Sequence, residues 1–309
     1  MYLGNALLIG VGGSGKQSLA RLAAFISSID VFQIAIKPNY GVNDFKTDLN
    51  NLYRRAGLKG LACMFLLSDG QITDEQFLVF INDYLSSGEI FRLFTDDEID
   101  EIIQSLRSEA KSQGYNDTHE SIWKYFIDKV RRNLKIVLCF SPVGNILRVR
   151  ARRFPAIFNS TMIDWFHPWP REALYSVVTR FLDKFISIDN NLRVNIANFM
   201  ADTHLDVKQV STQYLLNERR SYYTTPKTFL EFIKLFQFIY ENKKMKIEQE
   251  IVRLLSGLEK LSSISAQTAI LQEDLKVSTE EVNSKPEKAE AALKIVTAEA
   301  DKVAKEKVR

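Results

Sequence analysis

The nine residues Gly10–Ser18, GVGGSGKQS, decide the fold of this chain, and they follow directly on the apolar run Ala6-Leu7-Leu8-Ile9. Glycines at positions 10, 12, 13 and 15 allow the backbone to turn its N–H groups inward around phosphate oxygens. A helix that begins at Lys16 would add the positive end of its dipole to the same anion. The order strand, glycine loop, lysine, helix therefore predicts a phosphate-binding loop in which Lys16 reaches the terminal phosphates.

The position after the lysine departs from the usual pattern, because Gln17 stands where a Ser or Thr hydroxyl normally holds magnesium. Its amide oxygen is able to coordinate Mg²⁺, but from a longer side chain. Ser18 lies about 100° further round the helix, so we expect it to face away from the metal. The candidate contacts of this loop to a nucleotide, ATP or ADP, are Gly10, Gly12, Gly13, Ser14, Gly15, Lys16, Gln17 and Ser18.

A second candidate site residue is Asp69, which follows a strand-like apolar run further along the chain. The run reads Met64-Phe65-Leu66-Leu67-Ser68-Asp69. In phosphate-loop enzymes an acid at the carboxyl end of such a strand commonly holds magnesium. We therefore predict an Mg²⁺ site formed by Asp69 and Gln17. In the alternative interpretation, Asp69 only begins the turn into the next helix.

The base for ATP hydrolysis is not visible in the sequence. Ring ATPases usually carry a glutamate directly after the acid of this strand, where it polarises the attacking water. Here Gly70 and Gln71 occupy those positions. Glu75 falls in an expected helix, and we interpret it as a surface charge.

Several other polar residues are open to two interpretations. Ser141, at the end of the run KIVLCFS, either contacts the terminal phosphate or caps the strand. Lys227 either closes on phosphate from the helix that it opens or is an ordinary first-turn lysine. An arginine cluster either faces the nucleotide of a neighbouring subunit or forms a solvated helix face. Its members are Arg148, Arg150, Arg152 and Arg153.

Short apolar runs alternate with helical patterns through residues 1–168, which is typical of an α/β fold with a parallel sheet covered by helices on both faces. The expected strands are 6–11, 31–36, 62–68, 136–141 and 161–166. The expected helices are 16–28, 44–56, 74–85, 96–110 and 118–133. Residues 169–240 are wholly helical in pattern and predict a small lid, with helices over 172–186, 192–204, 209–218 and 226–240.

From residue 241 to residue 309 an apolar residue recurs at every seventh position, which indicates a coiled-coil helix. The column is Ile247, Leu254, Leu261, Thr268, Leu275, Val282, Ala289, Val296 and Val303, and Ile251, Leu258 and Leu293 accompany it. Such a face requires a partner, so either the chain dimerises or this helix is the first half of an antiparallel hairpin. A solvated single helix is the alternative. Pro286 interrupts the pattern and predicts a kink or a local fray.

Composition sets further limits on function. The 309 residues carry a net charge of only +3, which gives no general attraction to nucleic acid or to a membrane surface. No apolar run has the length needed to cross a bilayer. The cysteines, Cys63 and Cys139, both lie in strand-like runs, and the histidines lack metal-ligand spacing. We therefore expect no nucleic-acid partner, no membrane partner and no histidine metal site.

Taken together, six stretches of the chain resemble the fourth AAA+ module of an axonemal (ciliary) dynein heavy chain, together with the first helix of the microtubule-binding stalk. The resemblance covers essentially the whole chain. The stretches are GVGGSGKQSLARLAAFI, YGVNDFKTDLNNLYRRAGLKG, ITDEQFLVFINDYLSSGEI, VLCFSPVG, FPAIFNSTMIDWFHPWP and TPKTFLEFI.

This resemblance implies one module of a motor in which six AAA+ modules form a ring, the first as the main ATPase and the fourth as a regulatory nucleotide site. It implies that the glycines and Lys16 form the phosphate loop, with Asp69 as the acidic strand end, Ser141 as the sensor and Lys227 as the lid sensor. The implied partners are neighbouring AAA+ modules, the return helix of the stalk, microtubules through the stalk tip and other dynein chains. The implied location is the cytoplasm, within the cytoskeleton of the ciliary axoneme.

Four residues depart from the general AAA+ pattern. They are Gln17 for Ser or Thr, Gly70 for the catalytic Glu, Ser141 for Asn and Ser160 at the usual position of the arginine finger. Loss of a water-orienting residue or of the finger lowers hydrolysis by orders of magnitude. We therefore expect a module that binds ATP or ADP and hydrolyses it slowly, if at all, within a larger protein. The alternatives are a free-standing AAA+ ATPase that forms a homo-ring and a structural module with an empty site.

Overall fold

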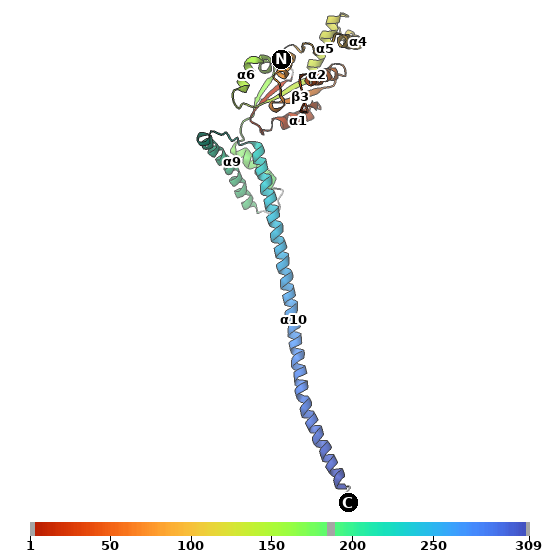
Figure 1. Ribbon diagram of the computed structural model, residues 1–309, viewed down its shortest axis with the longest axis vertical. Helices are drawn as coiled ribbons and strands as arrows, with labels where there is room; N and C mark the ends of the chain where they lie inside the picture. The colour runs from red at the N-terminus through yellow and green to blue at the C-terminus, as the bar shows by residue number, and fades with distance from the viewer. Residues whose placement is uncertain (1–3, 184–188, 307–309) are drawn as a thin grey trace. The chain divides into compact units, whose positions relative to one another are not determined.

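The computed structural model describes residues 4–183 and 189–306, which form two compact units, Met1–Lys234 and Leu235–Arg309 (Figure 1). The sheet and the helices that surround it lie in the first unit. The second unit consists of the greater part of one long helix. The predicted subdivision at residue 168 within the first unit stays a prediction.

A five-stranded sheet in the order β2-β3-β4-β1-β5 forms the centre of the first unit. Its strands are β1 (Ala6–Ile9), β2 (Asp30–Phe32), β3 (Cys63–Ser68), β4 (Leu134–Phe140) and β5 (Met162–Trp165). Every neighbouring pair is parallel, which confirms the predicted α/β fold class. β2 is shorter than the strand expected over residues 31–36.

The register of the sheet brings three strand ends to one edge. Ile9 of β1 lies opposite Phe140 of β4, and Ser68 of β3 lies opposite Cys139 of β4. The segments that follow these strands therefore start side by side, although they are separated by up to about 130 residues of sequence. They are the glycine loop, the turn at Asp69 and the segment that begins at Ser141.

The helices of the described residues agree in large part with the expected ones. Those before β4 are α1 (Lys16–Ile26), α2 (Val42–Gly57), α3 (Gln76–Ser87), α4 (Asp96–Ser112) and α5 (His119–Asn133), with a 3₁₀ turn η1 (Asp69–Gln71). Those after it are α6 (Ile146–Arg153), α7 (Pro155–Asn159), α8 (Arg171–Leu182), α9 (Asn190–Glu218) and α10 (Pro226–Glu306). The separate helices α6 and α7 were not among the expected elements.

The predicted break between helices 192–204 and 209–218 was wrong, because α9 continues through it. Residues 205–208, Leu-Asp-Val-Lys, contain neither glycine nor proline, so no residue there stops a helix. The end of the helix expected over residues 172–186 lies outside the described residues.

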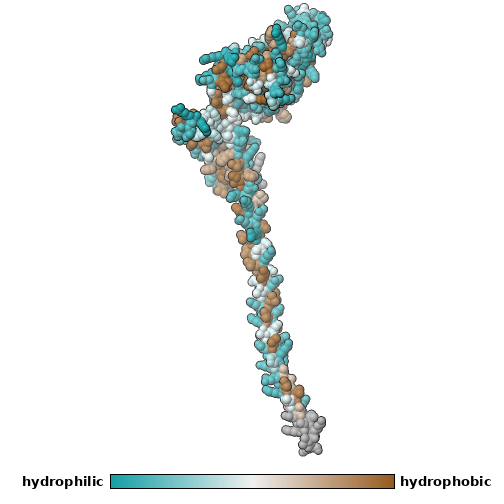
Figure 2. All heavy atoms as spheres, viewed as in Figure 1, coloured by the Kyte–Doolittle hydropathy of each residue, from teal (hydrophilic) through white to brown (hydrophobic). Residues whose placement is uncertain are grey.

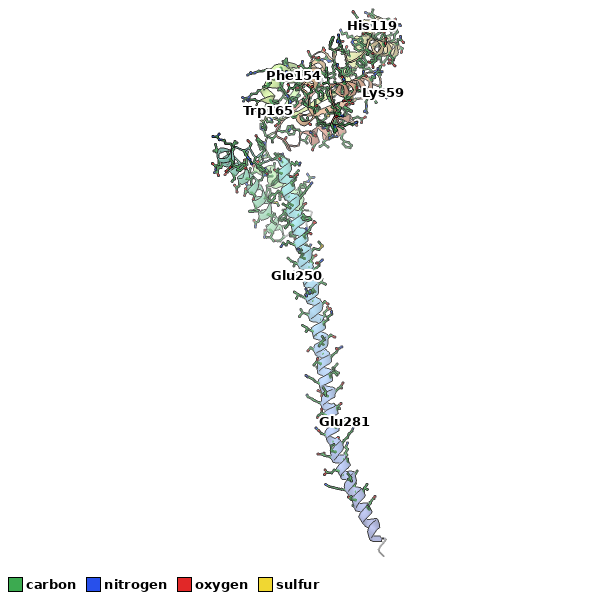
Figure 3. All side chains as sticks on the ribbon, in the orientation of Figure 1. Lys59, His119, Phe154, Trp165, Glu250 and Glu281 are labelled. Atoms are coloured by element: carbon green, nitrogen blue, oxygen red, sulfur yellow. The ribbon has the colours of Figure 1, made fainter. Side chains whose placement is uncertain are left out.

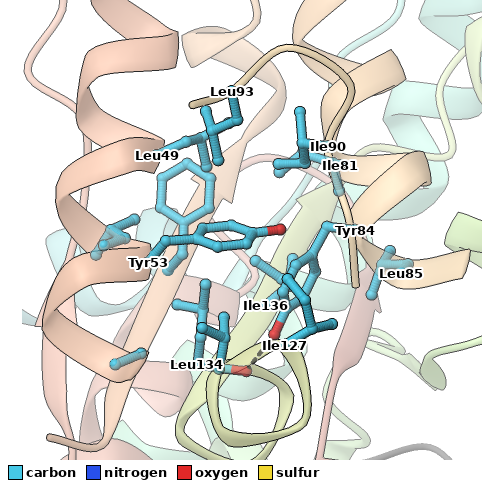
Figure 4. Close-up of a cluster of buried hydrophobic side chains, with 14 of the residues drawn as sticks. Leu49, Tyr53, Ile81, Tyr84, Leu85, Ile90, Leu93, Ile127, Leu134 and Ile136 are labelled. Atoms are coloured by element: carbon cyan, nitrogen blue, oxygen red, sulfur yellow. Dashed lines mark hydrogen bonds between the residues drawn. The ribbon is translucent and has the colours of Figure 1, made fainter. Parts of the chain in front are cut away.

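The central strands β3 and β4 are buried on both faces, as their continuous apolar runs require, whereas the edge strand β5 is exposed. On one face, side chains of α2, α3 and α5 pack on the sheet in an aromatic-rich cluster (Figure 4). Within it the Tyr84 hydroxyl donates a hydrogen bond of 2.7 Å to the carbonyl of Leu134, so the buried phenol has a partner. On the other face α1 contributes Ala20 and Ala24 to a smaller cluster that includes Leu66.

α10 is 81 residues long, which corresponds to about 120 Å of α-helix. Apolar side chains recur along it among polar ones (Figure 2), and the heptad residues Leu254, Leu261 and Leu275 are each exposed by more than half. The helix continues through Pro286 without a fray, and the alternative prediction of a kink at that residue stays a prediction. The side chain of Val303 lies outside the described residues.

Within residues 4–183 and 189–306, none of the helices combines the length and the apolar character needed to span a bilayer.

Gly57 gives a test of the packing between α2 and α5. A Cβ atom at this position would lie 2.2 Å from Cε2 of Phe126 and 2.8 Å from Cγ2 of Val130. We expect Gly57→Ala to lower the free energy of unfolding by about 1–3 kcal/mol, because the two helices have to separate to admit the methyl group. Urea denaturation followed by tryptophan fluorescence measures this loss.

The matched control is Gly257→Ala, at a helical glycine of α10 where an added Cβ would meet nothing within 4 Å. This variant should not lower the free energy of unfolding, because alanine in an open helix interior is more favourable than glycine by about 0.5–1 kcal/mol. Equal transitions for the two variants would contradict the close packing of α2 on α5.

Candidate functional site

The glycine loop is attached to the end of β1 by close backbone contacts. Gly10 donates a hydrogen bond of 3.0 Å from its N–H to the carbonyl of Phe140, which continues the β1–β4 ladder. A Cβ on Gly10 would lie 2.7 Å from Cβ of Phe166, so only glycine fits between β4 and the chain after β5. Gly13 has a φ of +81°, a conformation that other residues rarely adopt. Glycine at positions 10 and 13 is thus required by the turn itself.

A cavity of about 420 Å³ lies where the loop meets the ends of β3 and β4. It is lined by Gly12, Gly13, Ser14, Gly15, Lys16, Gln17, Ser18, Ser68, Asp69, Gly70, Cys139 and Ser141. The structure thus brings together most of the residues predicted from three separate stretches of sequence. Gly10 lies at the base of the loop, outside the lining.

The ammonium group of Lys16 is held by the loop that precedes it. Its Nζ donates to the carbonyl oxygens of Gly10 at 2.5 Å and Val11 at 2.9 Å, and to Oγ of Ser14 at 3.3 Å. Burial lowers the pKa of Lys16, while the nearby Cys139 and Asp69 oppose this shift. The charge therefore sits at the mouth of the loop with three neutral oxygen partners, which an anion is able to replace.

Asp69 has both of its carboxylate oxygens occupied. Oδ1 accepts a hydrogen bond of 2.6 Å from Nη1 of Arg150, and Oδ2 accepts a short hydrogen bond from the backbone N–H of Ser141. The Ser141 contact joins the ends of β3 and β4 across the cavity. Asp69 thus does more than begin a turn, since it links three segments of the site.

Arg150 is the functional residue that the sequence analysis misjudged. It is only 8% exposed, and its guanidinium lies 5.2 Å from the ring centroid of Phe140. The interpretation as a solvated helix face does not describe it, because the side chain is buried and pairs with Asp69 and Glu75. The interpretation in which the cluster faces a neighbouring subunit stays a prediction. The sequence signal that could have predicted this ion pair is the acid Asp69 at the end of β3 together with the arginine run of α6, which follows the adjacent strand β4.

Glu75 lies at the surface as predicted, with its side chain 41% exposed, but it is also paired with two arginines. Its Oε1 accepts a hydrogen bond of 3.3 Å from Nε of Arg150, and its Oε2 accepts one of 3.0 Å from Nη1 of Arg153. Together with Asp69 these residues form an alternating network of two acids and two arginines. Glu75 is therefore committed to positioning Arg150.

Gln71 is turned away from the cavity. Its amide oxygen accepts hydrogen bonds from the Ser68 backbone N–H at 3.0 Å and from the Ser68 hydroxyl at 2.8 Å. Its amide nitrogen donates a bond of 2.7 Å to the carbonyl of Ile34. With Gly70 beside it, the turn after β3 offers no free side chain for orienting a water molecule.

The residues at the cavity fit a phosphate group better than a magnesium ion. The loop supplies a buried ammonium and, at the start of α1, the backbone N–H groups that every helix leaves without intrahelical acceptors. A metal would find Asp69 already bonded at both oxygens and Gln17 in place of a hydroxyl. Ser18 also lines the cavity, and the expectation that its side chain faces away from a metal stays a prediction. Within the described part of the chain, no group of three His, Cys, Asp or Glu residues is placed to hold a metal.

Lys227 meets the glycine loop through its backbone. Its N–H donates a hydrogen bond of 3.1 Å to the carbonyl of Gly13, whereas its side chain is 69% exposed, with Nζ 3.7 Å from Oε1 of Glu231. The buried Thr225 caps the same helix end, because its hydroxyl accepts a hydrogen bond of 3.3 Å from the N–H of Thr228. The first turn of α10 is therefore fixed to the phosphate loop. Thr225 was not identified from the sequence.

Comparison with known proteins identifies the family. The family described as “P-loop containing dynein motor region D4” matches residues 1–239. The chain is 52% identical over 304 residues to human dynein axonemal heavy chain 17, and equally so to the ciliary dynein beta chain of Heliocidaris crassispina, covering 98% of this chain and 7% of each relative. It is 49% identical over 273 residues to the flagellar outer arm dynein beta chain of Chlamydomonas reinhardtii, covering 88% of this chain and 6% of that protein.

The chain therefore spans a small part of the length of these relatives, and the part that it spans carries the glycine loop and the sheet described above. Membership of a P-loop motor region implies a nucleotide-binding module in general. The chain belongs to the P-loop containing dynein motor region D4 family and is a homologue of axonemal dynein heavy chains.

Proposed function

We propose that this chain is the fourth AAA+ module of an axonemal dynein heavy chain and acts as a regulatory site that binds ATP or ADP with little or no hydrolysis. The observation that carries the proposal is the hydrogen bond from the Lys227 N–H to the Gly13 carbonyl, which joins the phosphate loop to the first turn of α10. A ligand in the loop thereby acts on the start of the longest helix.

Phosphate binding follows from the charges at the cavity. Lys16 makes its present bonds to neutral carbonyl and hydroxyl oxygens. Phosphate oxygens carry a full negative charge and form stronger hydrogen bonds with an ammonium group than neutral acceptors do. Exchange of the three loop oxygens for a polyphosphate is thus favourable, and the α1 N-terminus adds its dipole to the same site.

Hydrolysis is disfavoured because no carboxylate among the described residues at the cavity is left unpaired to act as a base for water. Among the described residues that line the cavity, the one carboxylate is Asp69, and Arg150 and Ser141 occupy its oxygens. Glu75 is paired with two arginines, and Gly70 has no side chain. Ser160, at the end of α7, stands in place of the arginine finger, whose loss costs about 10³–10⁵ in rate.

Exposed apolar faces support packing against neighbouring modules and a second stalk helix. On α1, Phe25 is 82% exposed and lies beside the exposed Leu22 and Ile26. Trp165, labelled in Figure 3, is also exposed at the end of the edge strand β5. Along α10, Glu250 and Glu281, labelled in Figure 3, directly precede the exposed residues Ile251 and Val282 of the heptad pattern. A heptad face of this kind packs stably against another helix.

We propose accordingly that α10 pairs with the return helix of a microtubule-binding stalk. In this assignment the protein acts with the other modules of its heavy chain and with other dynein chains in the ciliary axoneme, and its microtubule contact lies at the stalk tip. The names of the similar proteins, which include axonemal, ciliary and flagellar dyneins, support this placement.

Replacement of Lys16 tests nucleotide binding. We expect Lys16→Ala to weaken binding of a fluorescent ADP analogue by at least about tenfold, because a hydrogen bond to a charged group contributes about 1.5–3 kcal/mol. Fluorescence titration of the 309-residue chain gives the dissociation constants. Lys227→Ala is the control, since its exposed side chain pairs with Glu231, and it should change the affinity by less than about twofold. Absence of binding by the unmodified, folded chain would favour a structural module with an empty site.

Hydrolysis is tested separately by phosphate release. We expect the unmodified chain to release phosphate from ATP no faster than the Lys16→Ala variant, because the one carboxylate among the described residues that line the cavity, Asp69, is already paired with Arg150 and Ser141. Turnover clearly above that of the variant, together with hexamers in size-exclusion chromatography, would instead support a free-standing ring ATPase.

A further inference from the structure

We infer that Arg150 takes the place of a metal ion as the partner of Asp69, so that this site binds nucleotide without depending on Mg²⁺. The inference rests on the proposed nucleotide binding and adds a statement about the cation requirement of the same site.

The position of Arg150 is fixed from three sides. Its Nη1 bonds to Oδ1 of Asp69 at the end of β3, and its Nε bonds to Oε1 of Glu75 just before α3. The face of the guanidinium lies over the ring of Phe140 at the end of β4. Arg150 itself belongs to α6. Moving the Arg150 side chain would break both ion pairs and its contact with Phe140, which costs free energy.

The charges of this network already balance. Two carboxylates, Asp69 and Glu75, alternate with two guanidinium groups, Arg150 and Arg153. A divalent cation bound directly to Asp69 would compete with Arg150 for the same carboxylate and would place two positive charges beside its guanidinium. The Arg150 side chain is only 10% exposed, so weakening its bond to Asp69 would leave a buried charge with Glu75 as its remaining carboxylate partner, which is unfavourable.

The glycine loop likewise indicates a site that does not depend on Mg²⁺. Gln17 occupies the position from which a short hydroxyl side chain would normally complete the metal coordination. Both protein ligands that a P-loop site usually offers to magnesium are thus missing or engaged. The positive charge near the phosphates comes from Lys16 and from the helix N-terminus instead.

The experiment compares binding of a fluorescent ADP analogue to the 309-residue chain in excess EDTA and in excess MgCl₂. For the unmodified chain we expect the two dissociation constants to agree within about twofold. We expect Arg150→Gln to make binding at least about tenfold tighter with MgCl₂ than with EDTA, because Asp69 becomes free to coordinate the metal. Electron paramagnetic resonance of Mn²⁺ with ADP should likewise show more protein-bound metal for this variant.

Two further variants locate the effect. Arg153→Gln is the matched control, since Arg153 is 60% exposed and bonds to Glu75 rather than to Asp69, and it should keep the ratio of the unmodified chain. The double variant Arg150→Gln, Asp69→Asn should lose the magnesium dependence gained by Arg150→Gln alone. Circular dichroism and tryptophan fluorescence establish that each variant is folded.

The outcomes separate the inference from the proposed function. If the unmodified chain binds the analogue at least about tenfold more tightly in MgCl₂ than in EDTA, the inference is overturned, and the proposed function still stands. An unchanged ratio in folded Arg150→Gln would also overturn it. Failure to bind the analogue in either buffer would overturn the proposed function itself, and the inference with it. If Arg150→Gln does not fold, the ratio measured on the unmodified chain still decides.

Discussion

The contact of Gly10 with the neighbouring strands is the constraint on which the site depends. Its N–H continues the ladder to β4, and the absence of a side chain lets the loop pass close to Phe166. This contact holds the start of the loop against the sheet. The Lys16 ammonium in turn bonds to the carbonyl oxygens of Gly10 and Val11 at the start of the loop. The sheet, the loop and the start of α1 thus act as one rigid cradle for an anion.

Around this loop, the polar side chains named below form hydrogen bonds within the protein, so these groups are not left free for catalysis. Asp69 bonds to Arg150 and Ser141, Gln71 bonds to the backbone of β3, and Lys16 bonds to its own loop. A site built for hydrolysis keeps its acid and base free for metal and water. The arrangement here favours retention of a ligand, and the remaining contact of the loop, through Gly13, leads to α10.

Features that depend on local sequence periods could be predicted, and features that depend on pairing between distant residues could not. The glycine loop follows from one local motif, the strands from short apolar runs, and the coiled-coil character of α10 from its seven-residue repeat. The inward position of Arg150 depends on an ion pair with Asp69, 81 residues away, and no local pattern encodes it. The contact made by Lys227 was missed for another reason, because it uses a backbone N–H that every residue except proline possesses.

Hydrogen exchange with and without ADP tests the central claim most directly, since the claim is that a ligand in the loop acts on the start of α10. ADP should slow exchange of the backbone amides of residues 10–18 and, through the Gly13–Lys227 hydrogen bond, also alter exchange of residues 227–229. Slower exchange confined to the loop, with residues 227–229 unchanged at saturating ADP, would contradict the account.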